Sequence, residues 1–279
     1  MMSATPAILA LDFDGVLCDG LLEYFQVSWR AYFQIWKPDR AIVPEALADR
    51  FYRLRPVVET GWEMPVLIQA LQLDISESEI FSNWGTIAPQ LLADHGIKAQ
   101  EVAFTLDQLR DQWINTDLSG WLSLHRFYPG VVERLQVVLA SSTQPMIIST
   151  KESRFIRQLL QQQGIDWGTH PMIGKESKQP KYQVLRHLMA VAAPSRIWFV
   201  EDRLKTLQTV QAHGDLSQIR LYLADWGYNT AAERSAAQED GRVQLLSLPM
   251  FGQDFGDWPM PESTKMQSIG RSFELHSKD

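Results

Sequence analysis

Five short, bounded apolar runs constrain the fold of this 279-residue chain more than any other feature. They are Ala7–Leu11, Met146–Ile148, Ile197–Val200, Ile219–Leu223 and Val243–Leu246. Short, bounded runs of this kind are typical of strands buried on both faces of a parallel sheet. Helical periodicity lies between these runs, at Val131–Leu139, Ser153–Gln163, Lys181–Val191 and Lys205–Ala212. This alternation predicts an α/β fold, with a Rossmann-like three-layer α/β/α core and a doubly wound parallel sheet.

The region from about Gly20 to Arg126 has a different pattern. It is amphipathic and helical, with predicted helices at Leu22–Trp36, Glu45–Leu54, Met64–Leu71, Ser76–Leu92 and Thr105–Thr116. A helical block of this size predicts an inserted all-helical cap domain over residues 20–126. The core domain is then discontinuous, formed by residues 1–19 and 127–253. Residues 254–279 are rich in Pro, Ser, Gly and charge, which predicts a flexible tail.

Composition narrows the possible partners and the compartment. The formal net charge is −7, the pI is near 5.4, and no block of Lys and Arg stands out. This argues against nucleic acid or an anionic membrane as the main partner. The single cysteine, Cys18, excludes an internal disulfide and fits a reducing cytoplasm. We therefore expect a cytoplasmic protein that is a monomer or a weak homodimer.

Two pairs of acids directly follow predicted strands. Asp12 and Asp14 come after the first run, and Glu201 and Asp202 come after Ile197–Val200. The carboxyl ends of strands in an open α/β sheet meet along one edge, which is the usual ligand crevice. Four carboxylates gathered there would repel one another unless a cation lay between them. A hard divalent ion with oxygen ligands, most commonly Mg²⁺ with phosphate, satisfies this requirement.

Hydroxyl and basic groups accompany these acids. Ser149 and Thr150 follow the run Met146–Ile148, where hydroxyls and free backbone N–H groups at a strand-to-helix turn can hold phosphoryl oxygens. Lys178 and Lys181 lie near the start of the helix that precedes Ile197–Val200. Either lysine could neutralise the acids and keep a carboxylate in its nucleophilic form. The position at the helix start favours Lys181 by a narrow margin.

The order of these motifs resembles the haloacid dehalogenase superfamily, and within it the phosphoglycolate-phosphatase-like branch with a helical cap. The first motif is matched by residues 11–17, the second by 147–151 and the fourth by 199–202, and Trp226-Gly227-Tyr228 resembles a later loop of this branch. Tyr128-Pro129-Gly130 resembles the re-entry after such a cap. The third motif departs from the family, because Gln179 separates Lys178 from Pro180 where a Lys-Pro pair is common.

The resemblance implies a mechanism and a role for each residue. Asp12 would be the nucleophile that forms an aspartyl-phosphate, and Asp14 the general acid and base. Mg²⁺ would be bound by Asp12, the backbone carbonyl of Asp14, Asp202 and Glu201. The phosphoryl group would be held by Ser149, Thr150 and Gly15. An acid two residues after the nucleophile favours phosphoryl chemistry over haloacid chemistry.

The resemblance thus implies a hydrolase, a Mg²⁺-dependent phosphatase of a small phosphorylated metabolite. The alternatives are a phosphomutase of a sugar phosphate on the same core, and a catalytically idle binding or regulatory protein of this fold. Substrate choice is expected to lie in the cap. Arg55, in a loop between predicted helices, is either a ligand for an anionic group of the substrate or part of a solvated helix face.

Overall fold

The computed structural model describes residues 5–38 and 45–260. The chain forms two compact units, one of Met1–Asp19 with Phe127–Asp279 and one of Gly20–Arg126. We call the first the α/β unit and the second the helical unit.

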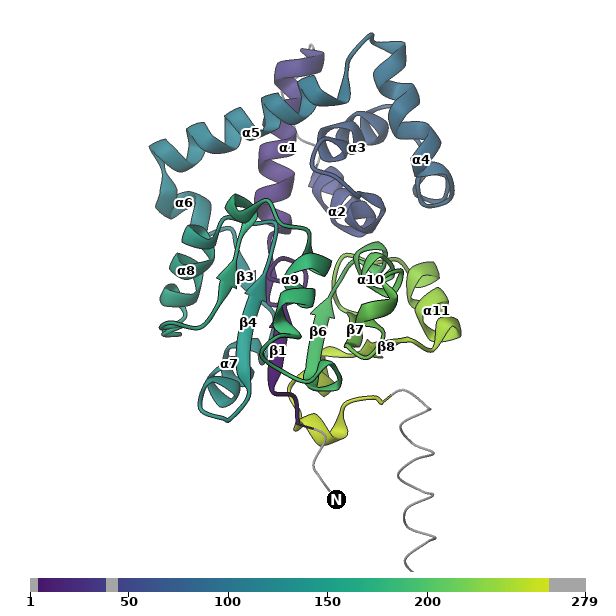
Figure 1. Cartoon of the computed structure of the whole chain (residues 1–279). Helices are drawn as coiled ribbons and strands as arrows, with labels where there is room; N and C mark the ends of the chain where they lie inside the picture. Colours follow the sequence, from purple (N-terminus) through teal and green to yellow (C-terminus); the bar gives the residue numbers. More distant parts are fainter. Residues whose placement is uncertain (1–4, 39–44, 261–279) are drawn as a thin grey trace, which may run out of the picture. The chain divides into compact units, whose positions relative to one another are not determined.

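A six-stranded parallel sheet is the centre of the α/β unit (Figure 1). In spatial order its strands are β5 (Met172–Ile173), β4 (Gln144–Ile148), β1 (Ile8–Leu11), β6 (Ile197–Glu201), β7 (Arg220–Ala224) and β8 (Val243–Leu246). Leu11, the last residue of β1, pairs with Ile147 of β4 and Val200 of β6, so these three strands end at one edge. The predicted parallel sheet is confirmed.

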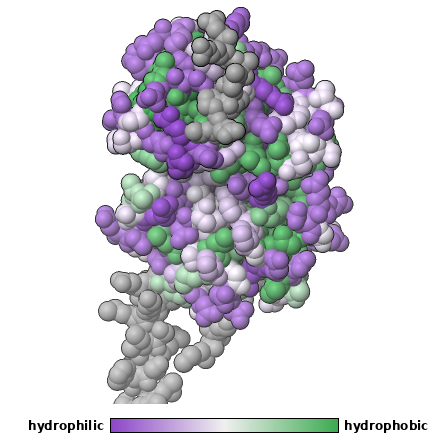
Figure 2. Space-filling view, turned by 180° about the vertical axis from the view of Figure 1, so that it is seen from behind, coloured by the Kyte–Doolittle hydropathy of each residue, from purple (hydrophilic) through white to green (hydrophobic). Residues whose placement is uncertain are grey.

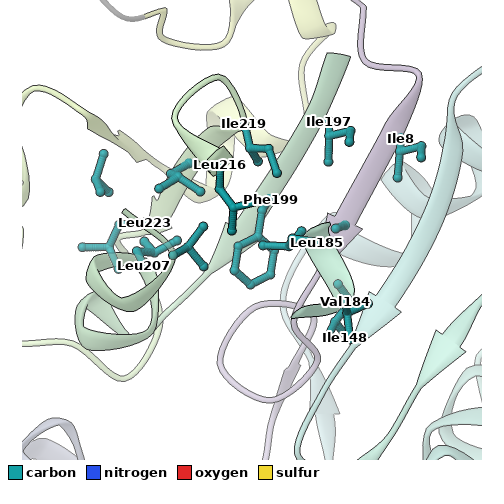
Figure 3. Packing of buried hydrophobic residues seen from close by; sticks show 14 of the residues in the cluster. Ile8, Ile148, Val184, Leu185, Ile197, Phe199, Leu207, Leu216, Ile219 and Leu223 are labelled. Atoms are coloured by element: carbon teal, nitrogen blue, oxygen red, sulfur yellow. The ribbon is translucent and has the colours of Figure 1, made fainter. Parts of the chain in front are cut away.

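Helices cover both faces of this sheet. They are α7 (Val131–Leu139), α8 (Ser153–Gln162), α9 (Lys181–Leu188), α10 (Leu204–Gln211), α11 (Ala231–Asp240) and α12 (Leu248–Phe251). On one face, α9 and α10 pack against the sheet through a continuous apolar layer. Figure 3 shows Phe199 of β6 within this layer, near Leu185 of α9. Helix α9 ends at Leu188, three residues earlier than predicted.

The opposite face holds a cluster of aromatic residues that includes the segment after residue 253. The rings of Phe255 and Trp258 lie 5.5 and 5.6 Å from that of Trp198 in β6, and Trp258 is 2% exposed. The guanidinium of Arg134 on α7 lies 4.4 Å from the Phe255 ring. The prediction of a flexible tail from residue 254 is therefore wrong for this segment. The rest of that predicted tail, residues 261–279, lies outside the described residues.

The helical unit contains α1 (Leu21–Trp36), α2 (Glu45–Leu54), α3 (Glu63–Gln72), α4 (Glu77–Asp94), α5 (Ala99–Thr116) and α6 (Leu118–Leu122). Helix α1 packs against α3 and α5. Its Glu23 is buried and accepts hydrogen bonds from Arg110 at 2.8 Å and Trp121 at 3.1 Å, so its charge is compensated. Two short strands, β2 (Cys18–Asp19) and β3 (Arg126–Phe127), pair where the chain passes between the units.

The surface agrees with the composition. Figure 2 shows one face on which hydrophilic side chains predominate, with smaller hydrophobic areas between them. Within residues 5–38 and 45–260, no helix combines the length and apolar character needed to cross a bilayer.

The aromatic cluster generates a stability prediction. Trp258→Ala should destabilise the protein by about 3–5 kcal/mol, because it leaves a cavity beside Trp198 and Tyr222. Urea unfolding followed by far-UV circular dichroism measures this loss. Phe104→Ala, at an aromatic residue that is 63% exposed, is the control and should change stability by less than about 0.5 kcal/mol. Equal stability of the two variants would contradict the packing described here.

Candidate active site

Asp12 is the first residue after β1, and its backbone N–H continues the pairing with β6 by donating to the carbonyl of Val200 at 3.0 Å. Its side chain is therefore held at the carboxyl edge of the sheet. The side chain is buried, and its Oδ1 accepts the N–H of Phe13 at 2.7 Å.

Lys181, the first residue of α9, joins the two acidic motifs. Its Nζ lies 2.9 Å from Oδ2 of Asp12 and 2.7 Å from Oε2 of Glu201. Burial alone would lower the pKa of Lys181, but the two carboxylates outweigh burial and raise it, so the group is an ammonium. Lys178 is exposed in the turn before α9, with φ of 53°. Of the two candidate lysines, the structure thus places Lys181 against Asp12.

Backbone groups hold the second acidic pair in place. Oε1 of Glu201 accepts the N–H groups of Asp202 and Arg203, both at 3.1 Å. Oδ2 of Asp202 accepts the N–H of Tyr228 at 2.8 Å, and the Asn229 side chain donates to the Asp202 carbonyl at 2.9 Å. The loop after β7 therefore sets the direction of the Asp202 carboxylate.

The donor set fits a hard divalent cation. Carboxylate oxygens of Asp12, Glu201 and Asp202 lie within 4.8 Å of one another, and all three residues are buried. Burial raises the pKa of Asp12 to about 7 despite the nearby Lys181, and burial also raises the pKa of Asp202 and of Glu201. Three carboxylates with one ammonium leave two negative charges, which a divalent ion with oxygen ligands would balance.

Asp14 and Ser149 lie on the β4 side of this cluster. Ser149 directly follows β4 and is buried, and its Oγ accepts the N–H of Lys151 at 3.2 Å. Nζ of Lys151 lies 3.1 and 3.3 Å from the two carboxylate oxygens of Asp14. Thr150, between Ser149 and Lys151, is exposed.

Two glycines allow the loops to approach Asp202. Gly15 has φ of +86°, and a Cβ there would lie 2.1 Å from Oδ2 of Asp202. A Cβ on Gly227 would lie 2.3 Å from Cβ of Asp202 and 2.5 Å from the carbonyl oxygen of Gly15. Both positions therefore require glycine.

The structure assembles most of the predicted site. In the α/β unit, each of these residues ends a strand, follows a strand end or begins a helix: Asp12, Asp14, Gly15, Ser149, Lys181, Glu201 and Asp202. Arg55 belongs to the helical unit, where it donates to the Val58 carbonyl at 3.0 Å and lies 5.2 Å from the Tyr24 ring. Its role in substrate binding stays a prediction.

Sequence reasoning missed two contributors. Lys151 directly follows the predicted hydroxyl residues Ser149 and Thr150. The available signal was a basic residue at a strand end where several acids were also predicted to gather. Tyr228 supplies a backbone N–H, which no residue type encodes.

The sequence matches no protein-family model and no curated protein. Solved structures do match. One is a haloacid dehalogenase-like family hydrolase from Streptococcus pneumoniae, 13% identical, covering 96% of this chain and 100% of that one, with a TM-score of 0.55. Another is a predicted phosphoglycolate phosphatase from Haemophilus somnus, 17% identical, covering 82% and 89%, with a TM-score of 0.54.

This is the fold of the haloacid dehalogenase-like hydrolases. The predicted resemblance is confirmed at the level of the fold. A haloacid dehalogenase-like fold does not by itself decide the reaction. The Mycobacterium tuberculosis protein named Protein Tyrosine Kinase A also matches, at 18% identity over 81% of this chain and 87% of that one, with a TM-score of 0.50.

The close approach at Gly227 can be tested. Gly227→Ala should destabilise this haloacid dehalogenase-like fold by about 1–3 kcal/mol, because the added methyl group overlaps Asp202 and the Gly15 carbonyl. Gly214→Ala is the matched control, since a Cβ there meets nothing within 4 Å and the change should be within about 0.5 kcal/mol. Thermal unfolding of both variants makes the comparison, and a Gly227→Ala variant as stable as the control would refute the overlap.

Proposed function

We propose that this chain is a Mg²⁺-dependent phosphatase that hydrolyses a small phosphorylated metabolite through an aspartyl-phosphate on Asp12. The observation that carries the proposal is the buried Asp12 carboxylate, paired with Lys181 at the sheet edge and accompanied by Asp14 and Ser149. Neighbours of the same fold that are named as phosphatases support the reaction class.

In the first half of the reaction, a carboxylate oxygen of Asp12 attacks phosphorus and the bond to the leaving oxygen breaks. The ammonium of Lys181 favours the ionised form of Asp12. Asp14, in its acid form, gives its proton to the leaving oxygen. Ser149 and the backbone N–H of Thr150 hold phosphoryl oxygens at the end of β4.

In the second half, Asp14 is a carboxylate and accepts a proton from water. The resulting hydroxide attacks phosphorus, the bond to Asp12 breaks, and inorganic phosphate leaves. Asp14 ends the cycle protonated, as it began.

Asp12 and Asp202 would hold Mg²⁺, together with Glu201 or the carbonyl of Asp14. When bound, the ion offsets the negative charge of the phosphoryl group. Glu201 already accepts two backbone N–H groups and the Lys181 ammonium, so its main role is to hold Lys181.

Activity gives the first test. The protein with Mg²⁺ should release inorganic phosphate from aryl phosphates, and Asp12→Asn should abolish the release because the amide is not a nucleophile. The control is Asp111→Asn, at an exposed acid of α5, which should retain full activity. A phosphate-release assay over a panel of phosphorylated metabolites then defines the substrate class.

The same assay separates the alternatives. A phosphomutase would convert a sugar phosphate into its isomer with little phosphate released. A catalytically idle binding protein would do neither, although folded and supplied with Mg²⁺. Either result would overturn the proposal.

The raised pKa of Asp12 gives a pH prediction. Below about pH 7 the folded protein keeps Asp12 protonated, so Mg²⁺ must displace a proton in order to bind. Mg²⁺ affinity should therefore rise from about pH 5.5 to about pH 8 and then level off. Titration calorimetry at each pH measures it.

In protein without Mg²⁺, the free energy of unfolding should change with pH in the opposite direction. A carboxyl whose pKa is raised by folding binds more protons in the folded state, so stability should fall as pH rises from about 4 to about 7. Asp12→Asn should reduce the pH dependence of Mg²⁺ affinity and also the pH dependence of stability. Mg²⁺ affinity that is constant over this range would contradict the assignment of Asp12 as a ligand.

A further inference from the structure

Lys151 and Asp14 form a partly enclosed ion pair that the proposed reaction scheme does not use. Nζ of Lys151 is nearly equidistant from the two oxygens of Asp14, at 3.1 and 3.3 Å. The Lys151 side chain is 9% exposed and that of Asp14 is 17% exposed. An ion pair this sheltered from water is stronger than a typical surface pair.

The backbone of Lys151 is fixed on both sides. Its N–H donates to Oγ of Ser149 at 3.2 Å, and its carbonyl accepts the N–H of Lys175 at 3.0 Å. The hydroxyl of Ser153, at the start of α8, donates to Glu176, which ties the same two loops together. The ammonium of Lys151 is therefore held by an anchored turn.

Two lysines pair with different acids of the site. Lys181 pairs with Asp12 and Glu201, and Lys151 pairs with Asp14. A short carboxylate side chain has several staggered rotamers, and repulsion from Asp12 and Asp202 would drive that of Asp14 away from the site. The Lys151 ammonium counters that repulsion on the side of Ser149. When one oxygen of Asp14 carries the proton, the same ammonium can still donate to the other oxygen and hold the acid form in place.

We propose that Lys151 is a positioning residue that holds the Asp14 carboxyl group where it can protonate the leaving oxygen. This inference rests on the proposed phosphatase function. Lys151 should affect one step, the departure of the leaving group. The loss of activity in a Lys151 variant should therefore depend on the basicity of the leaving group.

Leaving groups of different basicity isolate this step. 2,4-Dinitrophenolate departs without a proton, whereas the phenolate of phenyl phosphate needs one. The value of kcat/KM reports only the steps through leaving-group departure, so the later hydrolysis of the aspartyl-phosphate does not enter it. A residue that positions the proton donor should matter for phenyl phosphate and hardly at all for 2,4-dinitrophenyl phosphate.

The experiment compares kcat/KM of wild type and Lys151→Met on aryl phosphates of graded leaving-group pKa. Lys151→Met should lose on the order of tenfold or more on phenyl phosphate and less than about threefold on 2,4-dinitrophenyl phosphate. Lys151→Arg should recover part of the loss, since it keeps the charge. Lys175→Met, which replaces an exposed lysine side chain nearby, is the matched control and should match wild type on every substrate.

A double-mutant cycle provides a second measurement. If Lys151 acts through Asp14, adding Lys151→Met to Asp14→Asn should cause no further loss on phenyl phosphate. Additive losses, an equal loss on all leaving groups, or no loss at all would overturn the inference. Circular dichroism checks folding, and Lys151→Gln replaces Lys151→Met in both measurements if the methionine variant does not fold.

The two proposals fail in different ways. Absence of phosphate release by the wild type, or full activity of Asp12→Asn, would overturn the phosphatase function. An active wild type whose Lys151 variants show no leaving-group dependence would overturn only the role of Lys151.

Discussion

The ion pair of Lys181 with two buried carboxylates is the interaction on which the candidate site depends. Asp12 directly follows β1 and Glu201 ends the neighbouring strand β6, and one ammonium group contacts both, at 2.9 and 2.7 Å. Removing one partner of such a buried group costs about 3–5 kcal/mol, because the remaining charges are uncompensated. Since Lys181 begins α9 and Glu201 ends β6, this contact also ties a helix start to two strand ends. The same ionic contacts therefore hold the candidate catalytic groups in place and join the helix to the strands.

The strand order explains how so few loops can build the site. β1 lies between β4 and β6, and the three strands run parallel. Each strand end contributes a different component: the acids of the first motif after β1, hydroxyl and ammonium groups after β4, and the second acidic pair at β6. Parallel strands bring these groups to one edge, although the acids after β1 lie more than a hundred residues before the groups at β4 and β6 in the sequence.

Much of the fold could be predicted because buried strands and helices leave strong local patterns. Val131–Leu139 and Val243–Leu246 have the predicted bounds. Strand β5 was missed, since its two residues are too short to show periodicity. The segment after residue 253 was misread, because Pro, Gly and acidic residues surround the two aromatic residues, Phe255 and Trp258, that bury it.

Prediction of the site from the sequence is limited in the same way, because only features next to a strong local pattern could be found. Asp12 and Ser149 could be found because each follows an apolar run. The sequence favoured Lys181 over Lys178 only narrowly, since both precede the same strand, and only the observed geometry places Lys181 against the acids. The pairing of Lys151 with Asp14 depends on side-chain direction across two loops, which periodicity does not record.

The enclosure of Asp202 by glycines has a consequence for how relatives of this chain can diverge. Gly15 and Gly227 carry no functional group, yet each lies too close to Asp202 to accept even a methyl group. Tyr228 supports the same carboxylate through its backbone N–H, so its side chain is not constrained by that bond. Sequence drift in this region should therefore be slowest at residues without chemistry of their own. Distant relatives that share the fold but little sequence should be easier to recognise when these two glycines are included with the acids.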